Sequence, residues 1–452
     1  MRLKLLTLAL ALSAFPLAGH SEDLLDAYRE ARANDPVLSQ AEATRLATGE
    51  GVAQARALML PQINGSYGLQ QQSGGNRDST ISNPDGSITG IDVGHTRTRS
   101  LSATLSQTVL DLSQWANLAA ARSAARSQDA TYDAAAQNLY VRVTTAYFGV
   151  LTSQDALIFA KASEDSFKQA YDQADQRFKV GLSAVTDVYQ AKSEYELAKA
   201  QTVAAQNTLN DAKEALTQIT GKPVGDLKKL REDLPLTPPN PADPDAWVQA
   251  ALQSNASIHA SQYNVQAAEH DIDAARAGHL PTINASVTRG KSTSWFEQAS
   301  AAQLRSNGNG QYGTTVGLSV NVPIFSGGAT QSRVRQSIYQ RDEAQDSLES
   351  TRRQVVRDTL NFYRSVAAGI SQVEANKASV DSGQKALEAT RAGFDVGTQT
   401  MLNVLNAIQT LTQAESSYSQ SRHQLVLDQL QLKQSAGSID VKDVEMVNSM
   451  LQ

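Results

Sequence analysis

The chain has 452 residues, of which 6% are aromatic, and a formal net charge of −6 at pH 7. So few aromatic residues favour long, thin helices over one thick globular core, and the mild acidic excess argues against nucleic acid as a partner. Cysteine is absent, which excludes disulfides, thiolate metal sites, cysteine nucleophiles and a lipid-bearing cysteine.

Residues 1–21 are typical of a secretory signal peptide. Arg2 and Lys4 precede an apolar run from Leu5 to Phe15, and small residues follow before Glu22, which is the pattern that a signal peptidase cleaves. The run is too short for a membrane anchor, which needs about 20 apolar residues. Removing the signal takes away two positive charges, so the formal charge of the mature chain becomes −8.

Each half of the chain is predicted to open with one helix, at about 24–59 and 246–279. Each helix is expected to stop at a Leu-Pro pair, Leu60-Pro61 or Leu280-Pro281, because a proline disfavours the helical conformation of the residue before it.

The hydrophobic period then changes to two, which predicts β-strands. Apolar and polar residues alternate at 101–106 and at 316–322, and the partner strands are predicted at 63–70 and 283–288. Long segments rich in Gly, Ser, Asn, Asp and Thr separate the strands of each pair. The sequence therefore predicts two β-hairpins, each with one apolar face, at about 63–110 and 283–325.

A helical period follows each hairpin, at about 113–178 and 329–393. A helix of this length extends roughly 100 Å. The apolar positions Leu139, Val143, Ala146, Val150 and Leu157 have coiled-coil spacing, so the helix needs partners along its whole length. Second helices at about 184–220 and 400–436 supply them after turns at Gly181 and Gly397, where glycine can adopt the positive φ that ends a helix.

The two halves are repeats of one another. ARALMLPQIN at 55–64 corresponds to ARAGHLPTIN at 275–284, and from residue 139 onward an offset of 216 holds without a gap. Six of the twelve prolines fall between residues 221 and 245, which predicts a linker. The predicted organisation is a signal peptide at 1–21, a first repeat at 22–220, the linker at 221–245, a second repeat at 246–437 and a C-terminal tail at 438–452.

Four strands with one apolar face leave two unpaired edges, and four are too few to close a membrane barrel. Other copies of the chain must therefore complete the sheet. Three copies would supply twelve strands, with six helical hairpins below them forming a tube. The predicted fold class is mainly α with a β-barrel portion, built by a homotrimer with four strands per protomer.

From Asp23 to about Gly437 the chain resembles the TolC-type outer-membrane factors, the trimeric channel-tunnels of Gram-negative efflux and type I secretion. The resemblance rests on an ordered set of motifs, namely EDLLDAYREARANDPVL, VLDLSQW, TAYFGVL, RFKVGLSAVTDV, GHLPTIN, VPIFSGG and GFDVGTQTMLNVLNA. It implies a twelve-stranded outer-membrane β-barrel in lipid, continued by a long periplasmic α-helical barrel of coiled coils. It also implies a passive exit duct for drugs or secreted proteins, without a cofactor.

The resemblance further implies that the periplasmic tip opens like an iris. Opening would follow the binding of a periplasmic adaptor (membrane fusion protein) and an inner-membrane transporter of the resistance-nodulation-division or ABC type. The expected adaptor contacts are at the two tips, Val180, Gly181, Leu182, Val396, Gly397 and Thr398. In the alternative interpretation these residues only make the turns.

The gate positions that the resemblance implies are Thr186, Asp187, Phe394, Gln399, Asn403 and Asn406. The chain departs from the family at the last four. TolC-like members carry carboxylates where Asn403 and Asn406 stand, and a tyrosine and an arginine where Phe394 and Gln399 stand. Amide rings would bind cations weakly. Alternatively, Asn403 and Asn406 face a neighbouring helix.

A periplasmic coiled-coil adaptor, or another structural coiled-coil protein, is the alternative function, although it does not explain a strand hairpin before each pair of long helices. An enzyme is not indicated, because the six histidines lack metal-ligand spacing and no Gly-x-Ser-x-Gly motif occurs. GNGQYG at 308–313 precedes a strand, whereas a dinucleotide site opens a helix. The sequence does not identify the cargo, since a passive duct need not resemble what it conducts.

Overall fold

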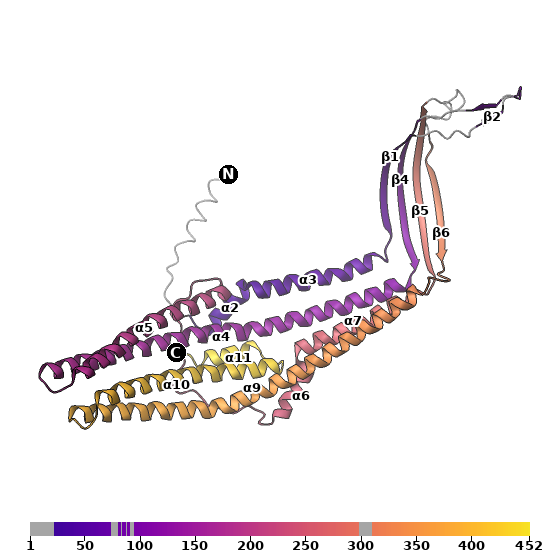
Figure 1. The fold of residues 1–452 in the computed structure, drawn as a ribbon. Coiled ribbons are helices and arrows are strands. Elements are labelled where there is room, and N and C mark those ends of the chain that lie inside the picture. Colours follow the sequence, from indigo (N-terminus) through magenta and orange to yellow (C-terminus); the bar gives the residue numbers. More distant parts are fainter. Residues whose placement is uncertain (1–21, 74–79, 83, 87, 91–94, 298–309) are drawn as a thin grey trace, which may run out of the picture. The chain divides into compact units, whose positions relative to one another are not determined.

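The structure is a computed structural model that describes residues 22–73, 80–82, 84–86, 88–90, 95–297 and 310–452 (Figure 1). The predicted signal peptide and the first two residues of the GNGQYG motif lie outside the described residues. The chain divides into two compact units, a first made of Met1–Thr44, Asp129–Ala260 and Glu349–Gln452, and a second made of Arg45–Gln128 and Ser261–Leu348.

Each half contains one very long helix followed by a shorter one, as predicted. Helix α4 spans Leu112–Lys179 and α9 spans Ala329–Asp395, with 68 and 67 residues. The shorter helices are α5, Val185–Thr220, and α10, Met401–Ser435. Proline is absent from all four helices, so nothing interrupts their backbone hydrogen bonds.

The prediction of one helix at the start of each half was wrong, because both are broken in two. Helix α2 (Leu24–Asn34) ends before α3 (Pro36–Ala57), and α6 (Pro244–Ser254) ends before α7 (Ala256–Ala277). Asp35 is extended, with φ −64° and ψ 118°, because the following proline excludes the helical region. Asn255 is extended without a proline, and its side chain accepts a hydrogen bond from the backbone N–H of Ser257 at 3.0 Å.

The second unit contains the sheet. Strands β1 (Gln62–Ser73), β4 (His95–Leu110), β5 (Thr282–Glu297) and β6 (Gly313–Asn321) are antiparallel and lie side by side in the order β1-β4-β5-β6 (Figure 1). Both predicted hairpins are therefore confirmed, and the pairing of β4 with β5 joins them. A short pair, β2 (Thr80–Ser82) and β3 (Ile88–Gly90), was not predicted.

The two faces of the sheet differ as the alternation predicted. Hydroxyl groups meet across strands on the polar face, where Ser66 lies 2.7 Å from Ser102 and Thr104 lies 3.1 Å from Thr288. On the other face the apolar side chains are exposed, for example Leu69 at 71%. None of the described helices has an apolar stretch long enough to cross a membrane.

The first unit is a helical bundle whose main core surrounds the middle of α4. Tyr147 and Phe148 are 0% and 1% exposed and pack with residues of α2, α5 and α10. The linker contributes to this core, because Leu227 and Leu230 pack into it and the Tyr147 hydroxyl donates to the carbonyl oxygen of Lys228 at 2.9 Å. The predicted tail contains a further helix, α11 (Val441–Asn448), with a capping box at Asp440.

His423 of α10 is buried in this bundle at 4% exposure. Its Nδ1 lies 2.7 Å from the Thr152 hydroxyl, and its ring lies 5.2 Å from that of Phe148. Burial lowers the pKa of His423 from 6.5 to about 4, with Arg422 adding to the decrease and Asp155 opposing it. The folded protein therefore holds this imidazole neutral.

This burial predicts a loss of stability in mild acid. Between pH 6.5 and about 4 the unfolded chain binds a proton at His423 that the folded chain does not. The free energy of unfolding therefore decreases as the pH is lowered through this range, by up to about 3 kcal/mol. We expect His423→Gln to flatten this part of the pH profile of the melting temperature. The exposed His279→Gln serves as the control, and an unchanged profile in His423→Gln would contradict the assignment.

Candidate functional site

The two turns that join the long helices have the same backbone structure. After α4, Leu182 N–H bonds to Arg177 C=O at 2.8 Å; after α9, Thr398 N–H bonds to Gly393 C=O at 2.8 Å. Gly181 and Gly397 have φ +78° and +80°, the left-handed conformation that closes a helix and that other residues rarely adopt. The glycines are thus required by the turns themselves.

Apolar side chains project from both turns. Val180 and Leu182 are 69% and 71% exposed in the first turn, and Val396 is 76% exposed in the second. Thr398 differs, because its hydroxyl turns back to donate to the Gly393 carbonyl oxygen at 3.0 Å. The predicted adaptor contacts therefore include three exposed apolar side chains, carried by two turns that backbone hydrogen bonds close.

Behind the turns, the ends of α4, α5, α9 and α10 pack together in what we call the tip cluster. Its buried members are Phe167, Ala170, Ala174, Val188, Ala191, Ala198, Leu387, Phe394, Met401, Val404, Leu405 and Ile408. Several are alanines, which let helices approach closely. The cluster thus holds the two helical hairpins of one protomer against each other.

Phe394 has a role in this cluster that the sequence did not reveal. It is 7% exposed, and the Arg177 guanidinium of α4 lies over its ring at 4.6 Å. Arg177 also donates from Nη1 to the Phe394 carbonyl oxygen at 3.3 Å. Next to this contact, Gln173 donates from Nε2 to Asp395 Oδ1 at 2.8 Å. These contacts, which we call the α4–α9 latch, link two helices whose pairing no sequence pattern predicted.

The only sequence signal for the α4–α9 latch is weak. Gln173 and Arg177 are four residues apart, and so lie on one face of α4, immediately before the first turn. The repeat does not help, because the residues at the matching positions of the second half are Ala389 and Gly393.

The remaining predicted gate residues fall into two separate groups. Asp187 is half-buried in the first turn of α5 and accepts a hydrogen bond from the Ser183 hydroxyl at 2.7 Å. In the second tip, Asn403 is exposed and donates from Nδ2 to Gln399 Oε1 at 2.7 Å. Thr186 and Asn406 are exposed in the protomer.

The two groups also differ in charge. The first tip has a carboxylate near a helix N-terminus, where the helix dipole stabilises negative charge. At the second tip, the corresponding helix is capped by the neutral Thr400 side chain, which accepts from the Asn403 N–H at 3.4 Å.

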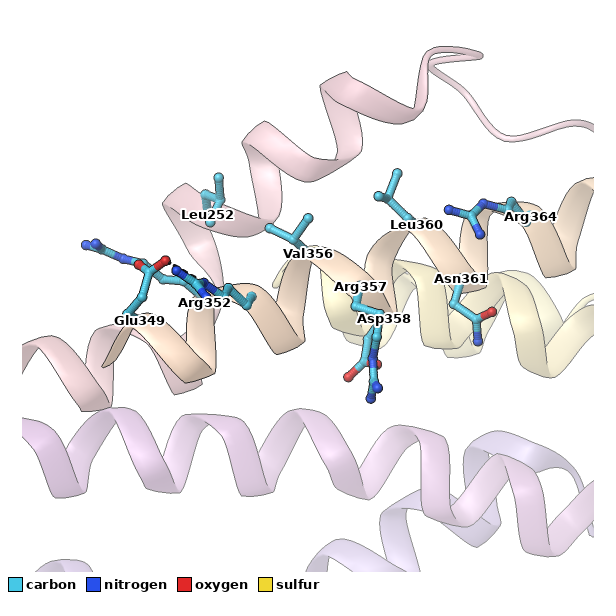
Figure 2. A pocket seen from close by; sticks show the side chains of 10 residues that line it. Leu252, Glu349, Arg352, Val356, Arg357, Asp358, Leu360, Asn361 and Arg364 are labelled. Atoms are coloured by element: carbon cyan, nitrogen blue, oxygen red, sulfur yellow. Dashed lines mark hydrogen bonds and ion pairs between the residues drawn. The ribbon is translucent and has the colours of Figure 1, made fainter. Parts of the chain in front are cut away.

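A hollow of 820 Å³ lies elsewhere in the first unit, between α6 and α9 (Figure 2). Leu252 faces Val356 and Leu360 across it, while Arg357, Asp358 and Asn361 point away from Leu252 (Figure 2). Arg353 pairs with Glu349 at 2.8 Å and Arg357 lies 3.6 Å from Asp358. Charges of both signs alternate along one helix, so the hollow is not a convergent site. Within the described part of the chain, no three His, Asp or Glu side chains gather as metal ligands.

Comparison with known proteins gives a consistent result. Residues 27–222 and 247–438 match the model of the family described as outer membrane efflux protein. The chain is 34% identical to outer membrane protein TolC of Escherichia coli, over 98% of this chain and 88% of that protein. It is 28% identical to the alkaline protease secretion protein AprF of Pseudomonas aeruginosa, over 94% of this chain and 86% of that protein.

Solved structures resemble the fold at low sequence identity. The structure of CusC has a TM-score of 0.74 with 20% identity, covering 94% of this chain and 96% of that one. The outer membrane protein VceC of Vibrio cholerae has a TM-score of 0.73 with 19% identity, covering 92% of this chain and 96% of that one.

The α4–α9 latch gives a direct prediction for Arg177→Gln. The variant loses the cation over the Phe394 ring, a contact worth about 1 kcal/mol at a half-exposed site, so local opening should become about fivefold more frequent. Hydrogen exchange of the amides from Gly393 to Val396 should accelerate by that factor. Arg391→Gln, an exposed change in the same part of α9, should leave the rates unchanged. Equal rates in Arg177→Gln and the wild type would show that the contact does not hold the tip.

Proposed function

The chain belongs to the outer membrane efflux protein family, and from this premise we propose how it acts. It is a passive outer-membrane exit duct, not an enzyme, and works as a homotrimer with a periplasmic adaptor and an inner-membrane transporter in efflux or type I secretion. The alternative, a periplasmic coiled-coil adaptor, does not fit a chain that matches this family in both halves and carries a four-stranded sheet.

The observation that carries the proposal is the four-stranded sheet, to which each repeat contributes one hairpin just before its long helix. Among the described strands, β1 and β6 form its two free edges. A sheet whose apolar face is exposed and whose edges are unpaired needs both lipid and further strands. Three copies satisfy both needs by closing a twelve-stranded β-barrel. The long helices then continue the channel on the periplasmic side.

We further propose that the domain organisation follows the two repeats, with a signal peptide at 1–21, repeats at 22–220 and 246–437, a linker at 221–245 and a tail at 438–452. The exposed Val180, Leu182 and Val396 support a role of the tips, with Gly181, Gly397 and Thr398, as the adaptor contact. The cargo is selected by the transporter and adaptor, because the duct itself need not bind what it conducts.

The proposed gate uses amides where relatives use charge. Asn403 and Asn406 are exposed one turn apart on α10, so three protomers would place rings of neutral amides at the constriction. Thr186, Asp187, Phe394 and Gln399 complete the proposed gate, and Asp187 is its one carboxylate. In this arrangement the α4–α9 latch, which includes Phe394, holds each protomer's two tips together while the gate is closed.

The function is tested by complementation in Gram-negative cells that lack their own outer-membrane factor. Cells that produce this chain together with the adaptor and transporter of its own host should regain dye export or secretion. The chain should appear in the outer membrane as a heat-modifiable trimer. A chain that stays soluble in the periplasm as a monomer would favour the alternative function.

The neutral amides predict weak block by multivalent cations in single-channel recordings. We expect Asn403→Asp combined with Asn406→Asp to lower the half-blocking concentration about tenfold or more, which corresponds to about 1.4 kcal/mol of added cation binding. Gln409→Asp, an exposed change further along α10, serves as the control. Asp187→Asn should remove any block of the wild type. Tight block that persists in Asp187→Asn would refute the proposed arrangement.

A further inference from the structure

The four-stranded sheet has two free edges, and the structure indicates how a second copy pairs with them. Among the described strands, β1 is paired only with β4, and β6 only with β5. The outward N–H and C=O groups of these edge strands lack ladder partners, and such edges bind further strands. The internal duplication specifies which residues would meet.

The two hairpins of one protomer correspond residue by residue. Strands β1 and β5 both begin directly after a Leu-Pro pair, at Gln62 and Thr282, an offset of 220. Within the first hairpin Ile63 pairs with Leu105, and within the second Ile283 pairs with Val320. Because Ile63 corresponds to Ile283, Leu105 corresponds to Val320.

The pairing of β4 with β5 shows how one hairpin joins the next. In that ladder Leu105 lies opposite Val287. Val320 is the counterpart of Leu105, and Tyr67 is the counterpart of Val287. We propose that β6 of one protomer pairs antiparallel with β1 of the next in the register that sets Val320 opposite Tyr67. This inference rests on the homotrimer of the proposed function and specifies its interface.

The faces of the two strands agree with this register. It sets Leu318 opposite Leu69, and these exposed side chains (70% and 71%) are both apolar. On the other face it sets Asn321 opposite Ser66 and Thr315 opposite Gln72, all polar. A slip of one residue would set Leu318 and Val320 against residues of the polar face of β1, because successive side chains point to opposite faces.

The helices next to the edges support the same interface. In the second unit α7 buries Val265 and Ile272 at 8% and 5% exposure, whereas the part of its counterpart α3 in this unit buries no residue and leaves Leu46 58% exposed.

The long helices differ in the same way within this unit. In this unit α4 buries Leu118, Ala120, Ser123 and Ser127, whereas α9 buries only Thr330 and Val334 and leaves Tyr339 68% exposed. Thus α3 and α9, the helices joined to the two edge strands, are less covered than α7 and α4. A neighbouring copy would cover them as one half of the protomer covers the other.

Cysteine pairs test the register in this cysteine-free chain. Gln72→Cys with Thr315→Cys places two thiols directly opposite each other across the proposed interface, and Gln70→Cys with Thr315→Cys is the control slipped by two residues on the same face. Within one protomer the edge strands are three strand spacings apart, about 14 Å, which is beyond the reach of a disulfide. Any disulfide must therefore join two copies.

We expect mild oxidation of the membrane-inserted Gln72→Cys, Thr315→Cys variant to give disulfide-linked dimers and trimers that a reductant separates. Their yield should be at least about fivefold higher than in the slipped control. Leu69→Cys with Leu318→Cys repeats the test on the apolar face, with Leu69→Cys and Val316→Cys as its slipped control. More disulfide in the slipped controls, or none in either matched pair when uncrosslinked trimers are present, would overturn the register.

The same variants separate this inference from the proposed function. Export is measured while the introduced cysteines are reduced, and the yield of disulfide crosslinks is measured in parallel. Matched pairs that crosslink in cells without restored export would refute the duct and leave the interface standing. Restored export with crosslinks only in the slipped pairs would refute the interface alone.

Discussion

The antiparallel pairing of β4 with β5 is the contact on which the rest of the structure depends. It joins two hairpins that come from different halves of the chain, and its register extends from His95 opposite Glu297 to Leu110 opposite Ile283. By placing β4 and β5 inside the sheet it leaves β1 and β6 at the edges. A single protomer therefore exposes both its apolar face and its unpaired backbone, two features that are stable only in an assembly.

The same duplication gives the helical unit two tips with one backbone and different chemistry. Both turns depend on a glycine with positive φ, so their geometry is nearly identical. The charge of the two tips differs, because Asp187, which accepts from Ser183, is a carboxylate. Asn403, which donates to Gln399 at the other tip, is a neutral amide. On α4, the Arg177 guanidinium lies over the Phe394 ring, so a contact between helices holds the second tip to the first.

Elements set by local patterns were predictable. The change of hydrophobic period from two to 3.6 located α4, α5, α9 and α10 within a few residues, because periodicity reflects which side chains a regular backbone aligns. The strands were located less closely, since β5 continues to Glu297 beyond the predicted end at 288. The break at Asn255 was not predictable in this way, since no proline follows it and the residue is held extended by its own side-chain hydrogen bond. The proposed gate residues could be named from a resemblance, whereas their contacts could not.

The sequence by itself determined the repeat, the lengths of the long helices, the alternation of the strands and the two glycine turns. Each of these depends on residues that are near one another in the chain or on similarity between the halves. Only the tertiary structure decided that Arg177 meets Phe394, 217 residues later, and that β4 lies beside β5. Such contacts are formed by packing between distant segments, and the pattern of neither segment specifies its partner.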